Sequence, residues 1–493
     1  MIQDLISGFY SILILKNIFA IIVGVNFGIF MGAMPGLTGT MGIALIIPLT
    51  YPLSPITAFC ILLGTYKGCL FGGSLPAILI NTPGTPAAAA TVLDGFPLAQ
   101  NGKAGKAMGI ALYSSVLADL FTTLCLIFVA VKLAEIALKF GPPEYASIVI
   151  FALTVIAGVS GKSLIKGFLV ASAGFLLGTV GLDPILSTPR FTFGIVELLR
   201  GISMMTMMIG LFAVSEVIIQ CERKQEESST FIPISKGGAT WKDLKICLPA
   251  IFRGSLIGLL IGAIPGIGAA PSSFLSYSET RRLSKHPEKF GKGAIEGVAA
   301  AESGNNAVCG GALIPLLALG IPGDITTAVL LGAFMIHGLA PGPELFTENS
   351  EIVYAIFACM IMANLFLFIF GSQAIKIFSL VTRLSKFVIF PVTAILCIIG
   401  VYGFNGSYFD LWVMLFFGLI GYVMRKNDFP IAPFLIAFIL EPIGERAIRQ
   451  SLILSDGSLL IFITRPISAF FIFLAIISIF LVLNMNRLGG KQL

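Results

Sequence analysis

The stretch Gly28–Thr40, GIFMGAMPGLTGT, returns in altered form as Gly258–Ala270, GLLIGAIPGIGAA. Five positions keep their residue at one constant spacing: Gly28, Gly32, Ala33, Pro35 and Gly36 correspond to Gly258, Gly262, Ala263, Pro265 and Gly266. Proline removes a backbone donor and glycine permits positive φ, so each Pro-Gly pair tends to stop a helix. The chain therefore contains two related segments, each interrupted at the same place.

The sequence around these breaks is that of a membrane protein. Of the 493 residues, 57% are hydrophobic and 11% are charged, which leaves too little polar surface to cover a water-soluble fold. The runs 352–375 and 466–486 carry no charge, and each is long enough for the ~20-residue span of a bilayer. These runs are continuously apolar, unlike lipid-facing barrel strands, whose residues alternate. We expect an all-α polytopic membrane protein with about 10–12 crossings.

A second pair of breaks supports an internal duplication. The segment GGSLPAILINTPGT at 72–85 resembles GGALIPLLALGIPGD at 310–324 after a one-residue gap, and Pro83 then matches Pro322. Two weakly similar membrane halves with matched interruptions are typical of transporters built from internal repeats. We expect Pro-Gly-broken or re-entrant helices whose freed amides and carbonyls face protein or a watery cavity. The alternative is that the breaks are kinks or tight turns at the membrane surfaces.

Loop charges indicate that the two halves are inverted relative to each other. The loop at 51–55, after the first break, is uncharged, whereas its counterpart at 281–292 carries five Lys and Arg residues. Because positively charged loops stay in the cytoplasm, the equivalent loops prefer opposite sides of the membrane. The polar stretch 221–245 cannot cross a bilayer. The sequence predicts a first membrane repeat over 17–220, a polar linker over 221–245, and an inverted second repeat over 246–485.

At these residues the chain resembles the large membrane subunit of the tripartite tricarboxylate transporter family. The matching motifs run in order from about residue 28 to residue 343: GAMPGLTGT, GGSLPAILINTPGTPAAAATVLDGFPLAQNGKAGKAMG, PRFTFG, GAIPGIGA, FGKGAIEGVAAAESGNNA, LGIPGD and HGLAPGP. The later YVMRKNDFPIAP and RPIS are also similar. One departure is Lys67 in YKGCLFGG, where the family pattern suggests tyrosine or another uncharged residue. Lys67 is therefore a candidate for tuning the preference for anionic substrates.

The resemblance implies a multi-pass carrier of the bacterial inner membrane that imports tricarboxylates or related carboxylates. It also implies a periplasmic solute-binding protein that delivers the substrate, a small membrane subunit, and an ion gradient with sodium or protons as the coupling cation. Two other classes stay open, namely the membrane subunit of an ion-pumping decarboxylase and a passive channel. Saturable uptake that depends on an ion gradient would favour the carrier over both.

Other kinds of site have no support in the sequence. No nucleophile, base and orienting group stand at a recognisable spacing, and the eight cysteines form no Cys-x-x-Cys pair and have no neighbouring His. The segment GKS at 161–163 lacks the glycine that a nucleotide-binding loop needs five residues earlier. We therefore expect no catalytic residue, no metal site, no cofactor and no enzyme activity. The net charge of +6 is small for this length and does not indicate nucleic acid as a partner.

The breaks themselves are the candidate substrate and ion site. Helix N-termini after a break present free amides and a positive dipole end to a carboxylate, and unwound carbonyls and hydroxyls suit a hard cation. The expected binding residues are Pro35, Gly36, Asn81, Thr82, Pro83, Gly84, Thr85, Pro265, Gly266, Asn305, Asn306, Pro322, Gly323 and Asp324. The alternatives are helix capping for the residues at 81–85 and helix packing for Asn305 and Asn306. Glu302 lies beside these asparagines, and polar groups inside a membrane need partners.

Overall fold

Helices make up most of the protein. The computed structural model describes residues 2–34, 37–159, 163–222, 237–381 and 386–489. In this part of the chain, seven helical segments are long and apolar enough, by length and composition, to cross a membrane. Six shorter apolar helices of 10–17 residues accompany them. The all-α polytopic membrane fold expected from the composition is confirmed.

The order of the helices is similar on the two sides of the polar linker. Before it come α1 (Ile2–Ile12), α2 (Leu15–Ala33), α3 (Gly39–Thr50), α4 (Pro55–Gly72), α5 (Ser74–Leu79), α6 (Ala89–Leu98), α7 (Ala104–Ala137), α8 (Pro142–Val159), α9 (Leu164–Gly178), α10 (Met204–Met208) and α11 (Ser215–Glu222). After it come α12 (Trp241–Gly262), α13 (Ala269–Leu283), α14 (Ile295–Leu319), α15 (Ile325–Ile336), α16 (Pro343–Glu348), α17 (Ser350–Val381), α18 (Lys386–Asn405), α19 (Tyr408–Lys426), α20 (Ile431–Leu454), α21 (Ile461–Thr464) and α22 (Pro466–Gly489). Two short strands, β1 (Gly181–Leu182) and β2 (Pro189–Arg190), pair antiparallel with Gly181 opposite Arg190. In each half a long helix, a break, a shorter helix, another long helix and a second break follow one another.

Local chemistry explains where the helices stop and start at the second break of the second half. Gly320 ends α14 in the left-handed conformation, with a φ of 72°, which residues with a Cβ rarely adopt. Asp324 then starts α15, since its carboxylate accepts the N–H of Thr327 at 2.7 Å. The Thr327 hydroxyl accepts the N–H of Asp324 at 2.9 Å in return. These reciprocal bonds form a capping box that sets the first turn of α15.

Glycines let α2 and α4 pack backbone against backbone. The facing residues are Gly24, Gly28 and Gly32 on α2 and Gly64, Gly68 and Gly72 on α4. A Cβ added at Gly28 would lie 2.2 Å from the carbonyl oxygen of Thr65, and one at Gly68 would lie 2.2 Å from that of Val25. Small residues at four-residue spacing allow membrane helices to approach this closely. The glycines of α12 at the matching positions, Gly254, Gly258 and Gly262, pack on α14.

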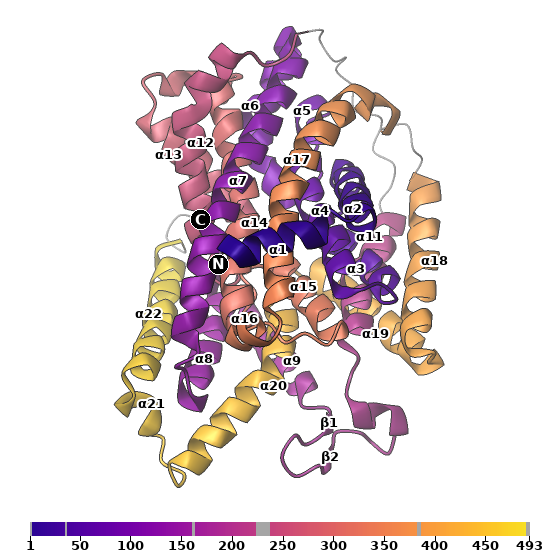
Figure 1. The fold of residues 1–493 in the computed structure, drawn as a ribbon, viewed down its shortest axis with the longest axis vertical. Helices are drawn as coiled ribbons and strands as arrows, with labels where there is room; N and C mark the ends of the chain where they lie inside the picture. Colours follow the sequence, from indigo (N-terminus) through magenta and orange to yellow (C-terminus); the bar gives the residue numbers. More distant parts are fainter. Residues whose placement is uncertain (1, 35–36, 160–162, 223–236, 382–385, 490–493) are drawn as a thin grey trace.

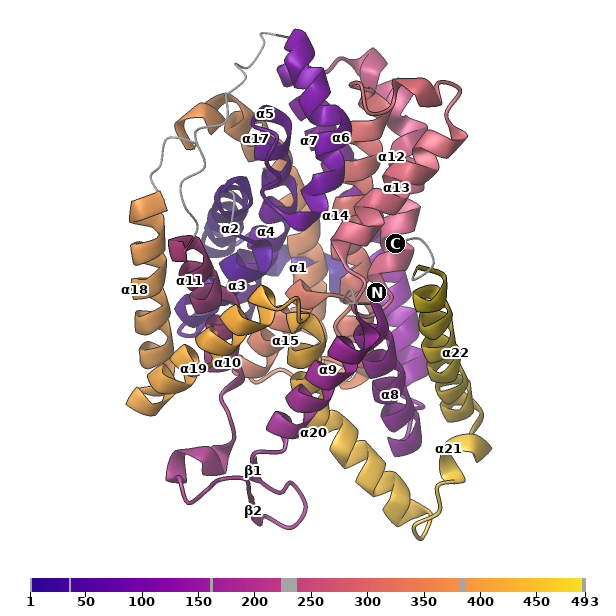
Figure 2. The ribbon, with the colours of Figure 1, turned by 180° about the vertical axis from the view of Figure 1, so that it is seen from behind.

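Helix α14 lies in the interior of the protein. It packs against α6, α7, α12 and α13, and nearly all of its residues are buried. In both views α14 is central, whereas α18 and α22 lie at opposite edges (Figures 1 and 2). Polar side chains on α14 therefore face neighbouring helices and not lipid.

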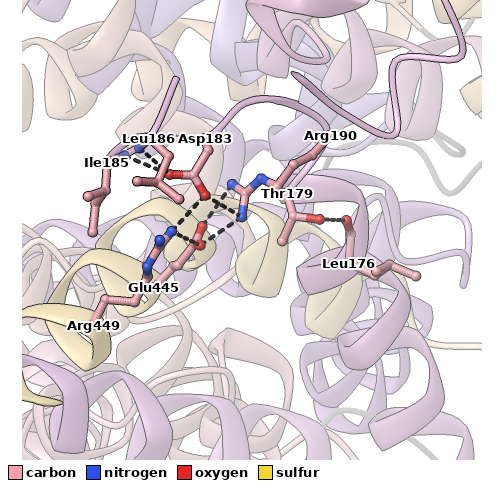
Figure 3. A network of polar contacts seen from close by, with 8 residues as sticks. All are labelled: Leu176, Thr179, Asp183, Ile185, Leu186, Arg190, Glu445 and Arg449. Atoms are coloured by element: carbon pink, nitrogen blue, oxygen red, sulfur yellow. Dashed lines mark hydrogen bonds and ion pairs between the residues drawn. The ribbon is translucent and has the colours of Figure 1, made fainter. Parts of the chain in front are cut away.

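A polar cluster ties the β-hairpin to α20. Arg190 donates two hydrogen bonds to the Glu445 carboxylate, of 2.7 and 3.0 Å, and Arg449 donates to both Glu445 and Asp183 (Figure 3). The N–H of Leu186 and the guanidinium of Arg449 hold the pKa of the Asp183 carboxyl well below its usual range. The hairpin lies at the end of the molecule opposite α12 and α13 (Figures 1 and 2).

Candidate functional site

One cavity of about 430 Å³ brings together helix starts from both halves of the chain. Its wall includes residues 38–40 at the start of α3, 85–87 just before α6, 268–270 at the start of α13 and 324–326 at the start of α15. A helix start carries free N–H groups and the positive end of the helix dipole. Because four such starts face one space, the cavity favours a negatively charged ligand. Its volume is within the ordinary range for small-molecule sites.

Hydroxyl groups line the cavity beside these helix starts. Thr40 of the first half and Thr326 of the second lie with their Oγ1 atoms 3.1 Å apart, which joins the two breaks across the cavity. Thr38 caps α3 by accepting the N–H of Met41 at 3.2 Å. The Thr85 hydroxyl oxygen is buried and has no hydrogen-bond partner among the described residues. An unpaired buried hydroxyl beside a cavity needs an explanation, and a shift of this side chain toward a ligand would supply the missing partner.

Charges of both signs line the cavity. Arg425, near the end of α19, supplies a guanidinium that also pairs with Glu216 of α11. A guanidinium has five N–H donors, so the pair with Glu216 leaves donors for a ligand carboxylate. On the wall formed by α15, the Asp324 carboxylate accepts a 2.8 Å hydrogen bond from the hydroxyl of Tyr66. The cavity can therefore accommodate an anion together with a cation.

Three of the predicted binding residues line this cavity, namely Thr85, Gly266 and Asp324. Asn81 and Thr82 are exposed and are not part of its wall. Asn81 has a φ of 56°, and the Thr82 hydroxyl donates to the carbonyl of Ile80 at 3.2 Å, as residues of a local turn do. These two residues, which belong to the second break of the first half, therefore lie outside the cavity wall.

The glycines of the second break in each half serve close packing. A Cβ added at Gly84 would lie 1.9 Å from the carbonyl oxygen of Gly32, and one at Gly323 would lie 2.4 Å from that of Gly262. The second break of each half is thus in contact with the C-terminal end of the first long helix of that half, α2 or α12. Three of the predicted prolines belong to the breaks but do not line the cavity: Pro83, Pro265 and Pro322. Pro35 and Gly36 lie outside the described residues.

Asn305 and Asn306 lie on α14, beside the cavity and not in its wall. Asn305 Nδ2 donates to the carbonyl of Leu70 at 3.2 Å, and Leu70 is a cavity residue. Asn306 Nδ2 donates to the Ser115 hydroxyl at 2.8 Å and lies 3.3 Å from a carboxylate oxygen of Glu302. The two asparagines therefore connect the cavity to a buried polar cluster.

Lys67 also lies behind the cavity wall. Its ammonium group is completely buried and pairs with Asp119 of α7, and it lies 3.3 Å from the hydroxyl of Thr123. Its neighbour Tyr66 points to the cavity residue Asp324 instead. The ammonium group of Lys67 is therefore held by Asp119 and does not line the cavity, and its role in substrate preference stays a prediction.

Sequence reasoning did not single out five polar residues of the cavity: Thr38, Thr40, Tyr66, Thr326 and Arg425. Thr38, Thr40 and Thr326 follow directly after the breaks, so extending each break by a few residues would have included them. Tyr66 lies next to Lys67 but in a continuous helical pattern. Arg425 occurs in a short basic stretch after an apolar run, a pattern that usually marks the end of a membrane helix.

Comparison with known proteins gives the following relationships. The sequence model of the Tripartite tricarboxylate transporter TctA family matches residues 18–436. An uncharacterized 52.8 kDa protein of the TAR-I ttuC' 3' region of Agrobacterium vitis is 37% identical over 472 residues, covering 95% of this chain and 93% of that protein. An uncharacterized protein of the TAR-II ttuC' 3' region of the same organism is 38% identical over 226 residues, covering 46% of this chain and 93% of that protein. No solved structure matches the chain.

Proposed function

The chain belongs to the Tripartite tricarboxylate transporter TctA family, and on this premise we propose that it is the large membrane subunit of a carrier for tricarboxylates or related carboxylates. The observation that carries this proposal is the cavity at which four helix starts and Arg425 face one space. Helix N-termini and guanidinium groups are the protein groups best suited to bind a carboxylate. Within the cavity, the substrate lies against the breaks at Thr85 and Gly266, while the Asp324 carboxylate suits the cation.

Uptake in this proposal is driven by a cation gradient, of sodium or protons, across a bacterial inner membrane. A periplasmic solute-binding protein delivers the carboxylate, and a small membrane subunit works beside the chain. Membership of a tripartite family supports the need for partners in general. The presence of Arg425 and Asp324 in one cavity supports joint binding of an anion and a cation.

Reconstitution tests this function. We expect proteoliposomes that contain the chain and its two partners to take up radiolabelled citrate saturably, and only when an ion gradient is imposed. Without the binding protein and the small subunit, uptake at low citrate should be about tenfold lower, because delivery raises the local substrate concentration. Full uptake by the isolated chain would reject the tripartite arrangement. Non-saturable flux that needs no gradient would identify a channel.

We also propose that residues 17–220 and 246–485 are inverted repeats separated by the linker 221–245. In this arrangement Pro55 is periplasmic and Lys285 is cytoplasmic, because the loop around Lys285 is strongly basic.

Cysteine accessibility measures this orientation directly. Cys221 is exposed and Cys125 is partly exposed, so both are first changed to serine. In that background a membrane-impermeant maleimide should label Pro55→Cys in intact spheroplasts, and Lys285→Cys only after permeabilisation. Labelling of both positions from one side would show that the two halves have the same orientation.

A further inference from the structure

A buried carboxylate on α14 lies next to the cavity and is not used by the proposed substrate site. Glu302 has no exposed surface. Its Oε1 accepts a short hydrogen bond from the Thr91 hydroxyl of α6. Its Oε2 accepts from the Ser115 hydroxyl of α7 at 3.2 Å and from Asn306 Nδ2 at 3.3 Å. Three helices thus enclose one acidic group.

The hydrogen-bond donors around Glu302 are neutral. In the part of the chain that the structure describes, no Lys or Arg forms an ion pair with it, because the nearby Lys67 pairs with Asp119 and Lys106 pairs with Asp243. An ionised carboxylate without a cation is costly in the interior of a membrane protein. Glu302 therefore needs either a bound cation or a proton.

Three other buried carboxylates beside α14 have partners that stabilise a negative charge. Asp94 accepts three backbone N–H groups, from residues 291, 293 and 294, at 2.8–2.9 Å, and also the hydroxyl of Tyr277. Asp119 has the ammonium group of Lys67, and Asp324 has the first turn of α15. Glu302 has neither an ammonium group nor a set of backbone amides. Glu302 therefore differs from these groups, because its surroundings favour the protonated, neutral carboxyl group over the ionised one.

Among the described residues, the titratable groups on α14 and on the helices packed against it form no hydrogen bond or ion pair with Glu302. Besides the Lys106–Asp243 pair they are Asp94 on α6; Tyr113, Asp119, Cys125, Lys132 and Glu135 on α7; Cys60, Tyr66, Lys67 and Cys69 on α4; Lys242, Lys245, Cys247 and Arg253 on α12; Tyr277, Glu279, Arg281 and Arg282 on α13; Glu296 and Cys309 on α14; Asp324 at the start of α15; and Glu344 and Glu348 on α16. Thr91 is three residues before Asp94, and Ser115 is four residues before Asp119, so these two carboxylates are the nearest acids along the packed helices.

A proton suits this site better than a metal cation. Asn306 presents Nδ2, a donor, to the carboxylate, and a donor faces a metal ion with its positive end. If a proton is added to Oε1, the new O–H can donate to Thr91 Oγ1, whose own hydrogen rotates away. The hydrogen bonds from Ser115 and Asn306 to Oε2 are then kept. Protonation of Glu302 therefore needs no movement of heavy atoms in this cluster.

The cluster is connected to the cavity on two sides. Asn305, three residues after Glu302, binds the carbonyl of the cavity residue Leu70, and its own Oδ1 is buried without a partner among the described residues. Thr91 follows the cavity residue Ala87 by one helical turn. A ligand that displaces Ala87 therefore acts on the segment that carries Thr91, which binds Glu302, and one that displaces Leu70 acts on Asn305, which lies on the same helix as Glu302.

We propose that Glu302 binds the coupling proton of the transport cycle, taking it up when the cavity opens to the more acidic side and releasing it on the other side. This inference rests on the proposed function, narrows its coupling cation to the proton, and places that proton on Glu302 beside the cavity instead of on Asp324 in its wall. Asn305 and Thr91 are positioning residues that connect the protonation of Glu302 to the occupancy of the cavity. Acid on the outer side of the membrane then drives carboxylate inward.

Infrared spectroscopy of the purified chain tests proton binding without any substrate. We compare wild type with Glu302→Gln, and use Glu296→Gln, the same change earlier on α14, as the control. The difference spectrum between wild type and Glu302→Gln should contain the carbonyl band of a protonated carboxyl group that disappears as the pH is raised. The Glu296→Gln protein should keep that band. Absence of the band, or a band that persists over the whole pH range of the folded protein, would overturn the inference.

Transport in proteoliposomes tests coupling, with citrate as the probe and both partners present. Wild type should accumulate citrate under an acid-outside pH gradient, and Glu302→Gln should lose this accumulation because it cannot exchange a proton. Glu302→Asp, which keeps a carboxyl group, should retain dependence on the pH gradient at a lower rate. Accumulation by Glu302→Gln under the pH gradient would refute proton coupling at this residue.

Two further outcomes separate this inference from the proposed function. If a sodium gradient alone drives uptake in wild type and Glu302→Gln abolishes it, the site binds sodium and the proton assignment is wrong. If the wild-type assembly takes up neither citrate nor another carboxylate, the proposed function fails. In that case the infrared titration still decides whether Glu302 exchanges a proton.

Discussion

Replacement of Arg425 by glutamine should raise the citrate concentration for half-maximal uptake by about ten- to a hundredfold. The reason is the loss of a charge-assisted hydrogen bond to a substrate carboxylate, which contributes roughly 1.5–3 kcal/mol. Among the described residues that line the cavity, Arg425 alone carries a positive charge, so none of them can replace it. The concentration dependence of uptake in proteoliposomes measures the effect.

The Arg425 experiment needs a control for the ion pair with Glu216, because removal of one partner leaves the other charge buried. Glu216→Gln removes that carboxylate and frees the guanidinium, so it should leave half-saturation unchanged or lower it. The double variant Glu216→Gln/Arg425→Gln should bind citrate as weakly as Arg425→Gln alone. If Arg425→Gln is made in normal amounts and half-saturates as wild type does, the arginine serves only the pair with Glu216.

Leucine at Gly28 should prevent the protein from folding into a single stable species. The Cβ position at Gly28 lies 2.2 Å from the carbonyl oxygen of Thr65, so a side chain there forces α2 away from α4. Overpacking costs about 1–3 kcal/mol where side chains can move. Here the neighbour is backbone, so we expect a cost at or above the upper end of that range. The yield of monodisperse protein after detergent extraction measures the effect.

Gly403→Leu is the matched control for this substitution. Gly403 also lies within a helix, α18, and a Cβ added there has no atom within 4 Å. Both variants replace a helical glycine by leucine, so intrinsic helix propensity changes equally. Gly403→Leu should be extracted in the same amount as wild type. Equal yields of the two variants would show that α2 and α4 can separate without loss of the fold.

The positions of the breaks could be read from the sequence because proline and glycine act on their own backbone. α12 ends at Gly262, just before Pro265, and α14 ends at Leu319, followed by Gly320, whose left-handed conformation favours glycine. The apolar composition predicted the membrane class in the same local way, since transfer into lipid depends on each residue's own side chain. The orientation of the two halves is still a prediction from loop charge.

The side of each break that faces the cavity could not be read from the sequence. Asn81 and Thr82 are the more polar residues of their break, yet they are exposed outside the cavity, whereas Thr85 lines it. Thr40 and Thr326 meet across the cavity although 285 residues separate them in the chain. The direction in which a break faces depends on how the long helices on either side pack, and this is a property of the whole fold.

By itself the sequence determined that this is a helical membrane protein with matched Pro-Gly breaks, because composition and local backbone chemistry are enough to specify both. Only the tertiary structure decided which polar residues act together. Lys67 is held by Asp119, Arg425 reaches the cavity from α19, and Glu302 is left with neutral donors. The partners of a charge inside a membrane protein come from other helices, and they are known only once those helices have packed.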